Sequence, residues 1–346
     1  MPESNNQNSH WKESALYRAE GFRKALRCAI LPGMKNFHFL ILGLAISLGS
    51  VAHAKSPAEI VAEAPANDWV EVPAEDLLVM TLPNTAQHGV RRVVIQLAPA
   101  PFAQGWVNNI RLLAQAQWWD GLAITRVQDN YVAQWGDPDG ENPATARALP
   151  PGLRQMPEAD YVVRGQLPQS KGMEEVFLPR NTASNWSNFY KGWPVAGAQI
   201  NGKPQNWLVH CYGMVGVGRN LSPDTGTGAE LYAVIGHAPR HLDRNIAVVG
   251  RVVQGIEHLS SLPRGTAALG FYANPKERTR IDTLRLVSDL PLTERPRFAV
   301  LASDSASFQA YAQARANRRD AFFNIPAGGA DVCNIPVPIR QIAPQQ

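Results

Sequence analysis

The most informative stretch of the sequence is residues 98–140, which read APAPFAQGWVNNIRLLAQAQWWDGLAITRVQDNYVAQWGDPDG. Within residues 102–117, apolar side chains recur at the 3.6-residue spacing of an amphipathic helix, at Trp106, Ile110, Leu113 and Ala114. Two runs typical of short strands follow, Leu122–Val127 and Tyr131–Trp135. Residues 136–140 combine glycine, aspartate and proline, which favours a tight turn. The stretch therefore predicts a helix, two strands and a turn in succession.

The remaining sequence is typical of many short strands with few helices. Apolar and β-branched runs predict strands at Leu77–Leu82, Arg91–Leu97, Trp207–Cys211, Gly213–Val217, Leu231–Ile235, Ala247–Val253 and Ile281–Val287, with weaker candidates at Tyr161–Val163 and Val176–Leu178. A second short helix is expected at Val253–Leu259. Hydrophobic residues make up 45% of the 346 and charged residues 18%, which excludes a wholly disordered chain. We therefore expect an all-β barrel or sandwich.

Three segments in chain order resemble the cyclophilin-type peptidyl-prolyl cis-trans isomerases. Residues 98–140 are similar to a family block with Asp-Gly, Arg-Val, an aromatic residue and Gln-x-Gly-Asp-Pro in the same register. Residues 210–219 (HCYGMVGVGR) and 226–255 (GTGAELYAVIGHAPRHLDRNIAVVGRVVQG) resemble two later family segments, and the whole resemblance runs from Leu77 to Asp289. It implies an all-β fold, an eight-stranded antiparallel closed barrel capped by two helices. Residues 141–209 form a longer insertion than the family core requires.

The resemblance also implies an active site for cis–trans isomerisation of X–Pro bonds, without cofactor or metal. Arg126 matches the family's catalytic arginine, and Gln134 and Glu230 fall on two further catalytic positions. The substrate-binding positions are matched by Tyr131, Val132, Tyr232, His241 and Leu242. Amide resonance sets a barrier of ~18–20 kcal/mol, and a fixed guanidinium aimed at the prolyl nitrogen stabilises the twisted transition state selectively. Arginine suits this role because it is always charged and rigidly forked.

Several matched positions depart from the family pattern. Glu230 stands where the family usually has Gln, His241 where many members have Trp, and Ile246 replaces a His. Glu230 either pairs with Arg126 and holds it away from substrate, or contacts a substrate amide as Gln does; we favour the second. Tyrosine hydroxyls where the family has Phe are expected to make the proline pocket wetter. A catalytically weakened domain that binds proline peptides or acts as a chaperone module stays open, as does a barrel that binds a small apolar ligand.

The first 54 residues are typical of a targeting segment. Residues 34–54, MKNFHFLILGLAISLGSVAHA, join a positive start, an apolar run and a small-x-small cleavage pattern, which predicts a signal peptide. The apolar run is short for a membrane span; a membrane anchor or a buried core helix is the alternative. Residues 1–33 are a leader or a mis-called start. We therefore expect a periplasmic protein with no stable membrane anchor after cleavage.

The mature chain is expected to have three parts. Residues 55–76 are rich in Ala, Pro and acidic residues, which predicts a linker or a lightly docked arm. Residues 77–290 are expected to form the isomerase domain. Residues 291–346 form an extension, helical at Ser303–Arg319 and Pro-rich and extended over residues 322–346.

Cysteine, histidine and charge patterns limit the other function classes. Cys211 and Cys333 remain after cleavage and form either one disulfide or two separate buried thiols. His237 and His241 have a helical ligand spacing, but a proline lies between them, so no metal is expected. Residues 55–346 hold 27 basic and 26 acidic side chains without a Lys/Arg cluster, so nucleic acid is not an expected partner. The expected partners are proline-containing polypeptides, bound by a monomer.

Overall fold

The computed structural model describes residues 54–346, apart from 86–88, 169, 174–175, 178–183 and 344–346. The predicted leader and nearly all of the predicted signal peptide lie outside the described residues. The helices are α2 (Pro57–Glu63), α3 (Gln104–Gln115), α4 (Glu257–Ser260) and α5 (Ala306–Ala316). The strands are β1 (Trp69–Glu71), β2 (Leu77–Leu82), β3 (Arg91–Leu97), β4 (Ala123–Val127), β5 (Val132–Gly136), β6 (Val163–Arg164), β7 (Trp186–Tyr190), β8 (Trp193–Ile200), β9 (Lys203–Leu208), β10 (Met214–Val217), β11 (Leu231–Val234), β12 (Val248–Gln254), β13 (Thr279–Arg280), β14 (Thr283–Leu286), β15 (Arg297–Leu301) and β16 (Ile339–Ile342).

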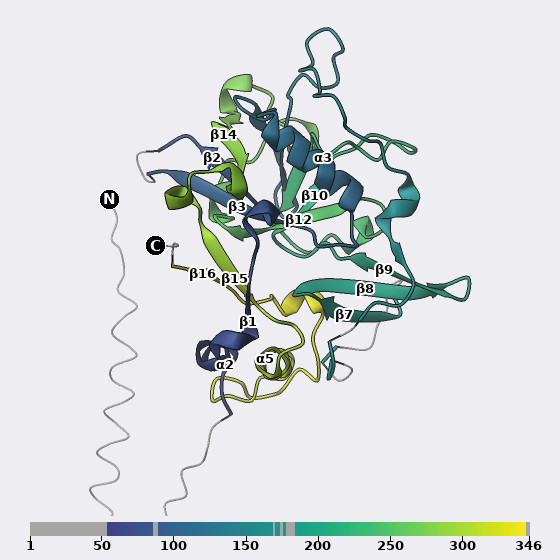
Figure 1. The fold of residues 1–346 in the computed structure, drawn as a ribbon, viewed down its shortest axis with the longest axis vertical. Coiled ribbons are helices and arrows are strands. Elements are labelled where there is room, and N and C mark those ends of the chain that lie inside the picture. Colours follow the sequence, from purple (N-terminus) through teal and green to yellow (C-terminus); the bar gives the residue numbers. More distant parts are fainter. Residues whose placement is uncertain (1–53, 86–88, 169, 174–175, 178–183, 344–346) are drawn as a thin grey trace, which may run out of the picture. The chain divides into compact units, whose positions relative to one another are not determined.

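The main sheet has nine antiparallel strands in the order β13-β4-β5-β11-β10-β12-β3-β2-β14, and it is curled (Figure 1). Its two end strands, β13 and β14, are separated along the chain by Ile281 and Asp282 alone. Gly121 N–H donates to the Ile281 oxygen at 2.8 Å, and Asp282 N–H donates to the Thr81 oxygen at 2.9 Å. One short segment is thus hydrogen-bonded to both ends of the sheet. The mostly β fold predicted from the sequence is confirmed.

Helix α3 packs an apolar face into the core and holds the segment that leads into β11. The buried apolar side chains of α3 are Trp106, Val107, Ile110, Leu113 and Ala114. Side-chain N–H groups of Trp106, Asn109 and Trp119 donate to backbone oxygens within residues 226–229 at 2.8–2.9 Å. Since buried backbone oxygens need partners, these bonds fix the path of the chain just before the candidate site.

The insertion at residues 141–209 builds a second sheet, of four strands in the order β6-β9-β8-β7. Arg251 of β12 connects it to the main sheet. Its guanidinium donates to the Gly192 oxygen at 2.6 Å and to Gln96 Oε1 at 2.9 Å, and lies 4.4 Å from the Trp193 ring centroid. Burial lowers the pKa of Arg251 to about 9. A buried cation shared between the sheets holds the insertion against the domain.

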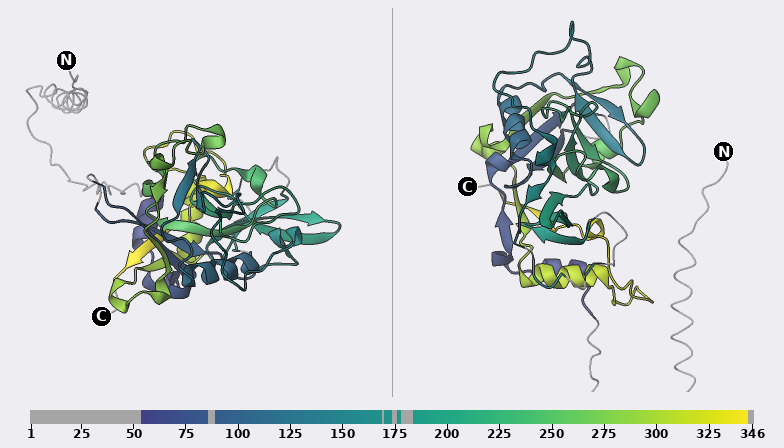
Figure 2. Two further views of the ribbon diagram at one scale, coloured as in Figure 1. Left: turned by 90° about the horizontal axis from the view of Figure 1, so that it is seen from above. Right: turned by 90° about the vertical axis from the view of Figure 1, so that its right-hand side faces the viewer.

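Residues 55–76, predicted to be a linker or a lightly docked arm, contain helix α2 and strand β1, which contact α5 and β15. Ser56 and Glu59 form a capping box at the start of α2, and α2 packs against α5 (Figure 2). β1 pairs with β15, and β16 from the C-terminal extension pairs with the other edge of β15. Both ends of the described chain thus share a three-stranded sheet. Composition could not indicate this, because the pairing partners lie far apart in the sequence.

Three short segments also differ from their predictions. The predicted strand at residues 161–163 is replaced by the end of a 3-10 turn and the start of the two-residue β6. Phe177, in the second weak candidate, forms an isolated bridge with Ala330. The predicted helix at residues 253–259 is reduced to α4, because the β-branched pair Val252-Val253 continues strand β12.

Candidate active site

Arg126, Gln134 and Tyr232 lie in one row across three neighbouring strands. Arg126 of β4 is opposite Gln134 of β5, and Gln134 is opposite Tyr232 of β11. Directly opposed residues of antiparallel strands place their side chains on the same face. Gly216 of β10 continues the row, and a Cβ atom there would lie 2.3 Å from the Tyr232 ring. The pairing register therefore brings three predicted site residues together, and a glycine makes room for the aromatic ring.

Hydrogen bonds from three of its nitrogens hold the Arg126 guanidinium. Nε donates to the Leu269 backbone oxygen at 2.6 Å, and Nη1 donates to Gln134 Oε1 at 3.2 Å. Nη2 donates to Gln128 Oε1. An arginine carries five N–H donors, so among the described residues these bonds leave two for a ligand.

Two aromatic rings lie against the same guanidinium. Arg126 Cζ is 5.5 Å from the ring centroids of both Tyr131 and Phe271, and Phe271 forms a backbone bridge with Arg126. Burial lowers the pKa of Arg126, but an arginine stays charged at neutral pH. The result is a half-buried, rigid positive charge between aromatic surfaces.

Glu230 binds the far side of Gln134. Gln134 Nε2 donates to Glu230 Oε2 at 3.2 Å, and burial raises the pKa of Glu230 to about 7 despite that hydrogen bond. Glycines make the space, since a Cβ at Gly136 would lie 2.1 Å from Glu230 Oε1 and one at Gly218 would lie 2.8 Å from Glu230 Cβ. In the described part of the chain, Glu230 meets Arg126 through Gln134 and not as an ion pair. The structure therefore does not contain the ion pair between Glu230 and Arg126 that was the first of the two alternatives.

An apolar cluster beside the row contains the predicted substrate-binding residues. Its buried members are Val132, Tyr232 and Val234, with Tyr131, Leu242 and Ile246 packed against them. The His241 ring stacks on Tyr131, with centroids 6.3 Å apart and planes at 16°. The structure thus brings all five predicted substrate-binding residues together in one apolar cluster.

The Tyr232 hydroxyl is engaged inside the protein. It lies 3.0 Å from His210 Nε2, and the Tyr232 side chain is only 4% exposed. Burial raises the pKa of this hydroxyl well above its usual value. The expectation that this hydroxyl would wet the pocket is therefore wrong for Tyr232.

Sequence reasoning missed three residues that hold Arg126. Gln128 follows Arg126 by two positions, so the alternation of a strand could have placed both on one face. Leu269 and Phe271 come from a loop more than 140 residues later in the chain. No local pattern could have indicated that contact.

Other candidate sites lie apart from this row. In the described part of the chain, no group of three or more His, Cys, Asp or Glu residues could hold a metal ion, and no helix is long and apolar enough to cross a membrane. A cavity of about 160 Å³ belongs to the four-stranded sheet and contains none of the predicted site residues. Its lining residues are Gln166, Leu167, Trp186, Gln199, Pro204 and Asn206.

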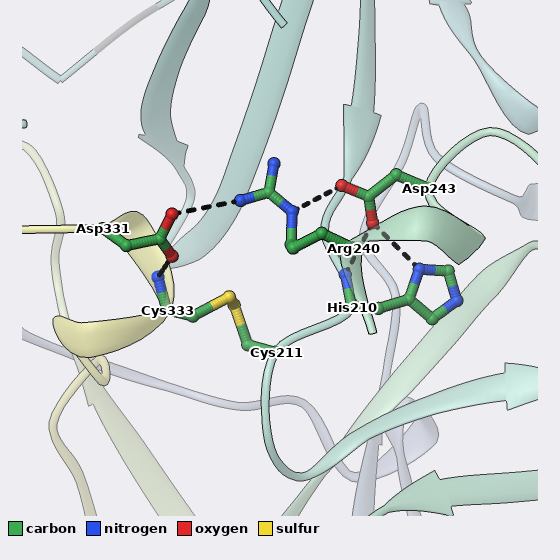
Figure 3. Close-up of a disulfide and its surroundings, with 6 residues drawn as sticks. All are labelled: His210, Cys211, Arg240, Asp243, Asp331 and Cys333. Carbon is green, nitrogen blue, oxygen red and sulfur yellow. Dashed lines mark hydrogen bonds and ion pairs between the residues drawn. A yellow bond between two sulfur atoms is a disulfide. The ribbon is translucent and has the colours of Figure 1, made fainter. Parts of the chain in front are cut away.

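Cys211 and Cys333 form a disulfide (Figure 3). The sequence left open one bridge or two thiols, and the structure has the bridge. It joins the chain between β9 and β10 to the C-terminal extension, beside the side chains of Arg240 and Asp243.

The site thus combines a curled antiparallel sheet with a fixed arginine beside an apolar and aromatic surface. The family model described as cyclophilin type peptidyl-prolyl cis-trans isomerase/CLD matches residues 84–285, more than half of the chain. The chain belongs to the cyclophilin-type peptidyl-prolyl cis-trans isomerase family, and its enzyme class is peptidyl-prolyl cis-trans isomerase.

A solved cyclophilin structure has the same fold. The chain is similar to the crystal structure of cyclophilin AquaCyp293 from Hirschia baltica, with 22% identity and a TM-score of 0.58, over 80% of this chain and 95% of that one. A Cryptosporidium parvum cyclophilin-type isomerase, crystallised in the presence of the dipeptide Ala-Pro, matches at 9% identity and a TM-score of 0.35, over 61% of this chain and 97% of that one. No curated protein matches the sequence.

Proposed function

We propose that this isomerase acts on X–Pro bonds of exported proteins and assists their folding, with Arg126 as its central catalytic residue. The observation that carries the proposal is the fixed Arg126 guanidinium beside the apolar cluster formed with Val132 and Tyr232. A proline ring seated on that cluster places its amide next to a charge that needs no reorganisation during the reaction.

The chemistry follows from the electronic structure of the amide. In the planar ground state the nitrogen lone pair is delocalised, which creates the barrier of ~18–20 kcal/mol. In the twisted transition state the lone pair becomes localised on nitrogen and accepts a hydrogen bond. The free N–H groups of Arg126 bind that form better than either planar isomer, which is the condition for catalysis.

Gln134 and Glu230 support the arginine and contact the substrate. The Gln134 carbonyl orients Arg126, and its amide nitrogen is directed by Glu230. The outer atoms of this pair can bind backbone amides of the polypeptide on either side of the X–Pro bond. Tyr131 and the stacked His241 extend the apolar surface for flanking side chains.

The export proposal rests on two features. Residues 34–54 have the pattern of a signal peptide, and the Cys211–Cys333 disulfide is of a kind that persists in oxidising compartments such as the periplasm. We propose a monomeric periplasmic enzyme with no stable membrane anchor after cleavage.

We also interpret the curled sheet as the eight-stranded closed barrel implied by the resemblance. This interpretation counts β13 and β14 as one bent strand. The hydrogen bonds of Gly121 with Ile281 and of Asp282 with Thr81 support it, because they join that strand to both ends of the sheet.

The experiment that tests the proposal compares isomerisation of a proline-containing peptide, in a protease-free assay, by the wild type and Arg126→Ala. We expect the variant to lose about 100-fold in kcat/KM, the size typical of losing one transition-state donor. Arg164→Ala, at an exposed arginine of β6, is the matched control and keeps the wild-type rate.

The two alternative functions, a weakened binding module and a barrel for a small apolar ligand, predict different results in this assay. A folded wild type that binds proline peptides without turnover would indicate the weakened binding module. A wild type that neither turns over nor binds them would leave a barrel for another apolar ligand.

A further inference from the structure

A chain of buried polar groups runs from the proline pocket to the C-terminal extension. The Tyr232 hydroxyl is 3.0 Å from His210 Nε2, and His210 Nδ1 is 3.0 Å from Asp243 Oδ1. His210 is fully buried, and Asp243 is 8% exposed. Such groups are retained in a core only when they are paired, so each depends on its neighbour.

Asp243 is the carboxylate in the middle of this hydrogen-bonded series. Besides His210 Nδ1, its Oδ1 accepts the His210 backbone N–H at 3.0 Å, and its Oδ2 accepts Arg240 Nε at 2.6 Å (Figure 3). Burial acts to raise the pKa of Asp243, but the bonds from His210 and the charge of Arg240 outweigh it and lower that pKa. A carboxylate only accepts, so His210 Nδ1 carries a proton. In the neutral ring, Nε2 is then the acceptor for the Tyr232 hydroxyl.

The disulfide anchors the end of this hydrogen-bonded series that lies farthest from Tyr232. Arg240 Nη1 lies 3.4 Å from Asp331 Oδ2, and Asp331 Oδ1 accepts the Cys333 N–H at 2.8 Å. Cys333 is bonded to Cys211, the residue that follows His210 (Figure 3). The contacts therefore close a ring in which the C-terminal extension supports His210 both covalently and through Arg240.

We propose that His210 and Asp243 are positioning residues of the proline pocket, which hold the Tyr232 ring against Val132 through its hydroxyl. The inference rests on the proposed function, because it concerns the same pocket. The family usually has Phe where this chain has Tyr232, and a phenylalanine has no hydroxyl that requires a hydrogen-bond partner. A tyrosine there must find a buried partner, and His210 supplies it. The outer end of the ring packs directly over Gly216, where a Cβ atom would lie 2.3 Å from the Tyr232 hydroxyl, and the hydrogen bond to His210 holds the hydroxyl at that place.

The test uses Tyr232→Phe, His210→Phe and the double variant in the whole chain. His210→Phe keeps a ring of similar shape but leaves the Tyr232 hydroxyl unpaired, and we expect KM for a proline peptide to rise about tenfold with kcat changed by less than about twofold. Tyr232→Phe alone raises KM by about two- to threefold. The double variant has no unpaired hydroxyl and returns to the value of Tyr232→Phe.

Methyl NMR of Val132 and Val234 gives a readout that needs no turnover, because both pack on Tyr232. Their signals shift in His210→Phe and return toward those of Tyr232→Phe in the double variant. If His210→Phe does not fold, Arg240→Gln removes the outer ion pair without emptying the core and shifts the same signals, whereas Arg164→Gln does not.

A double variant as impaired as His210→Phe would overturn the inference, as would unmoved methyl signals in both His210→Phe and Arg240→Gln. Lack of turnover in the wild type would overturn the proposed function instead. The methyl signals and the affinity for the dipeptide Ala-Pro would then still decide whether His210 positions Tyr232.

Discussion

Gln134 donates a hydrogen bond from Nε2 to Glu230 Oε2 at 3.2 Å. This bond settles the orientation of the Gln134 amide, whose oxygen must then face Arg126 and accept from it at 3.2 Å. An acidic residue where the family usually has Gln therefore does not neutralise the arginine directly. It directs the residue between them.

Gln134→Ala is expected to release one side of the Arg126 guanidinium. The charge stays in place through Leu269 but loses its preferred direction, so kcat/KM falls about tenfold, less than for Arg126→Ala. Steady-state rates on a proline peptide check this, with the exposed Gln155→Ala as control. An unchanged rate would show that Gln134 does not orient the arginine.

Glu230→Gln is expected to change how stability depends on pH. The folded pKa of Glu230 is raised to about 7 from the ordinary 4.5, so between these values the folded state holds a proton that the unfolded state has lost. Rising pH therefore destabilises the wild type across this window, by on the order of 3 kcal/mol, and the loss is nearly complete by about pH 8. Glu230→Gln has no such loss.

Urea unfolding at pH 4.5, 6 and 8 measures this difference. The free energy of unfolding of Glu230→Gln, relative to that of the wild type, should increase as pH rises from 4.5 to 8. Parallel pH profiles for the two proteins would mean that the Glu230 carboxylate is solvated and ordinary.

Gly136→Ala is expected to displace the Glu230 carboxylate. The new Cβ would lie 2.1 Å from Glu230 Oε1, and the flexible end of a glutamate can swing away, so the fold survives while the bond to Gln134 is lost. We expect kcat/KM to fall about three- to tenfold and the pH dependence of stability to flatten. The control is Gly89→Ala, since among the described residues, its two chain neighbours apart, no atom lies within 4 Å of a Cβ there. Equal behaviour of the two variants would contradict the packing described for Glu230.

Cys333→Ser is expected to lower the free energy of unfolding by about 2–5 kcal/mol, because the disulfide closes a long loop of the unfolded chain. The two cysteines are 122 residues apart in the sequence. Urea unfolding with and without a reducing agent measures the effect. The reductant should bring the wild type down to the variant and leave the variant unchanged; a wild type insensitive to full reduction would contradict the prediction.

Local sequence patterns predicted many of the helices and strands. The strands Leu77–Leu82 and Arg91–Leu97 have the predicted bounds, and α3 lies within the predicted helix at residues 102–117. In these segments the apolar spacing follows from the geometry of a strand or a helix, so it can be read residue by residue. The site residues from Arg126 to Gln134 were predicted from the family resemblance of residues 98–140, which is continuous along the sequence.

Contacts between segments that are distant in the sequence could not be predicted from it. Strand β1, in residues 55–76, pairs with an edge of β15, and Phe271 contacts Arg126 because a distant loop packs beside β4. The environment of Glu230, which sets its pKa, exists only after β5 and β11 are paired. Residue types and their spacing thus determine which helices and strands form and which chemical groups are present. Burial, strand register and long-range pairing determine how Arg126, Glu230 and Tyr232 are held. These three features depend on contacts between distant segments, which no local pattern encodes.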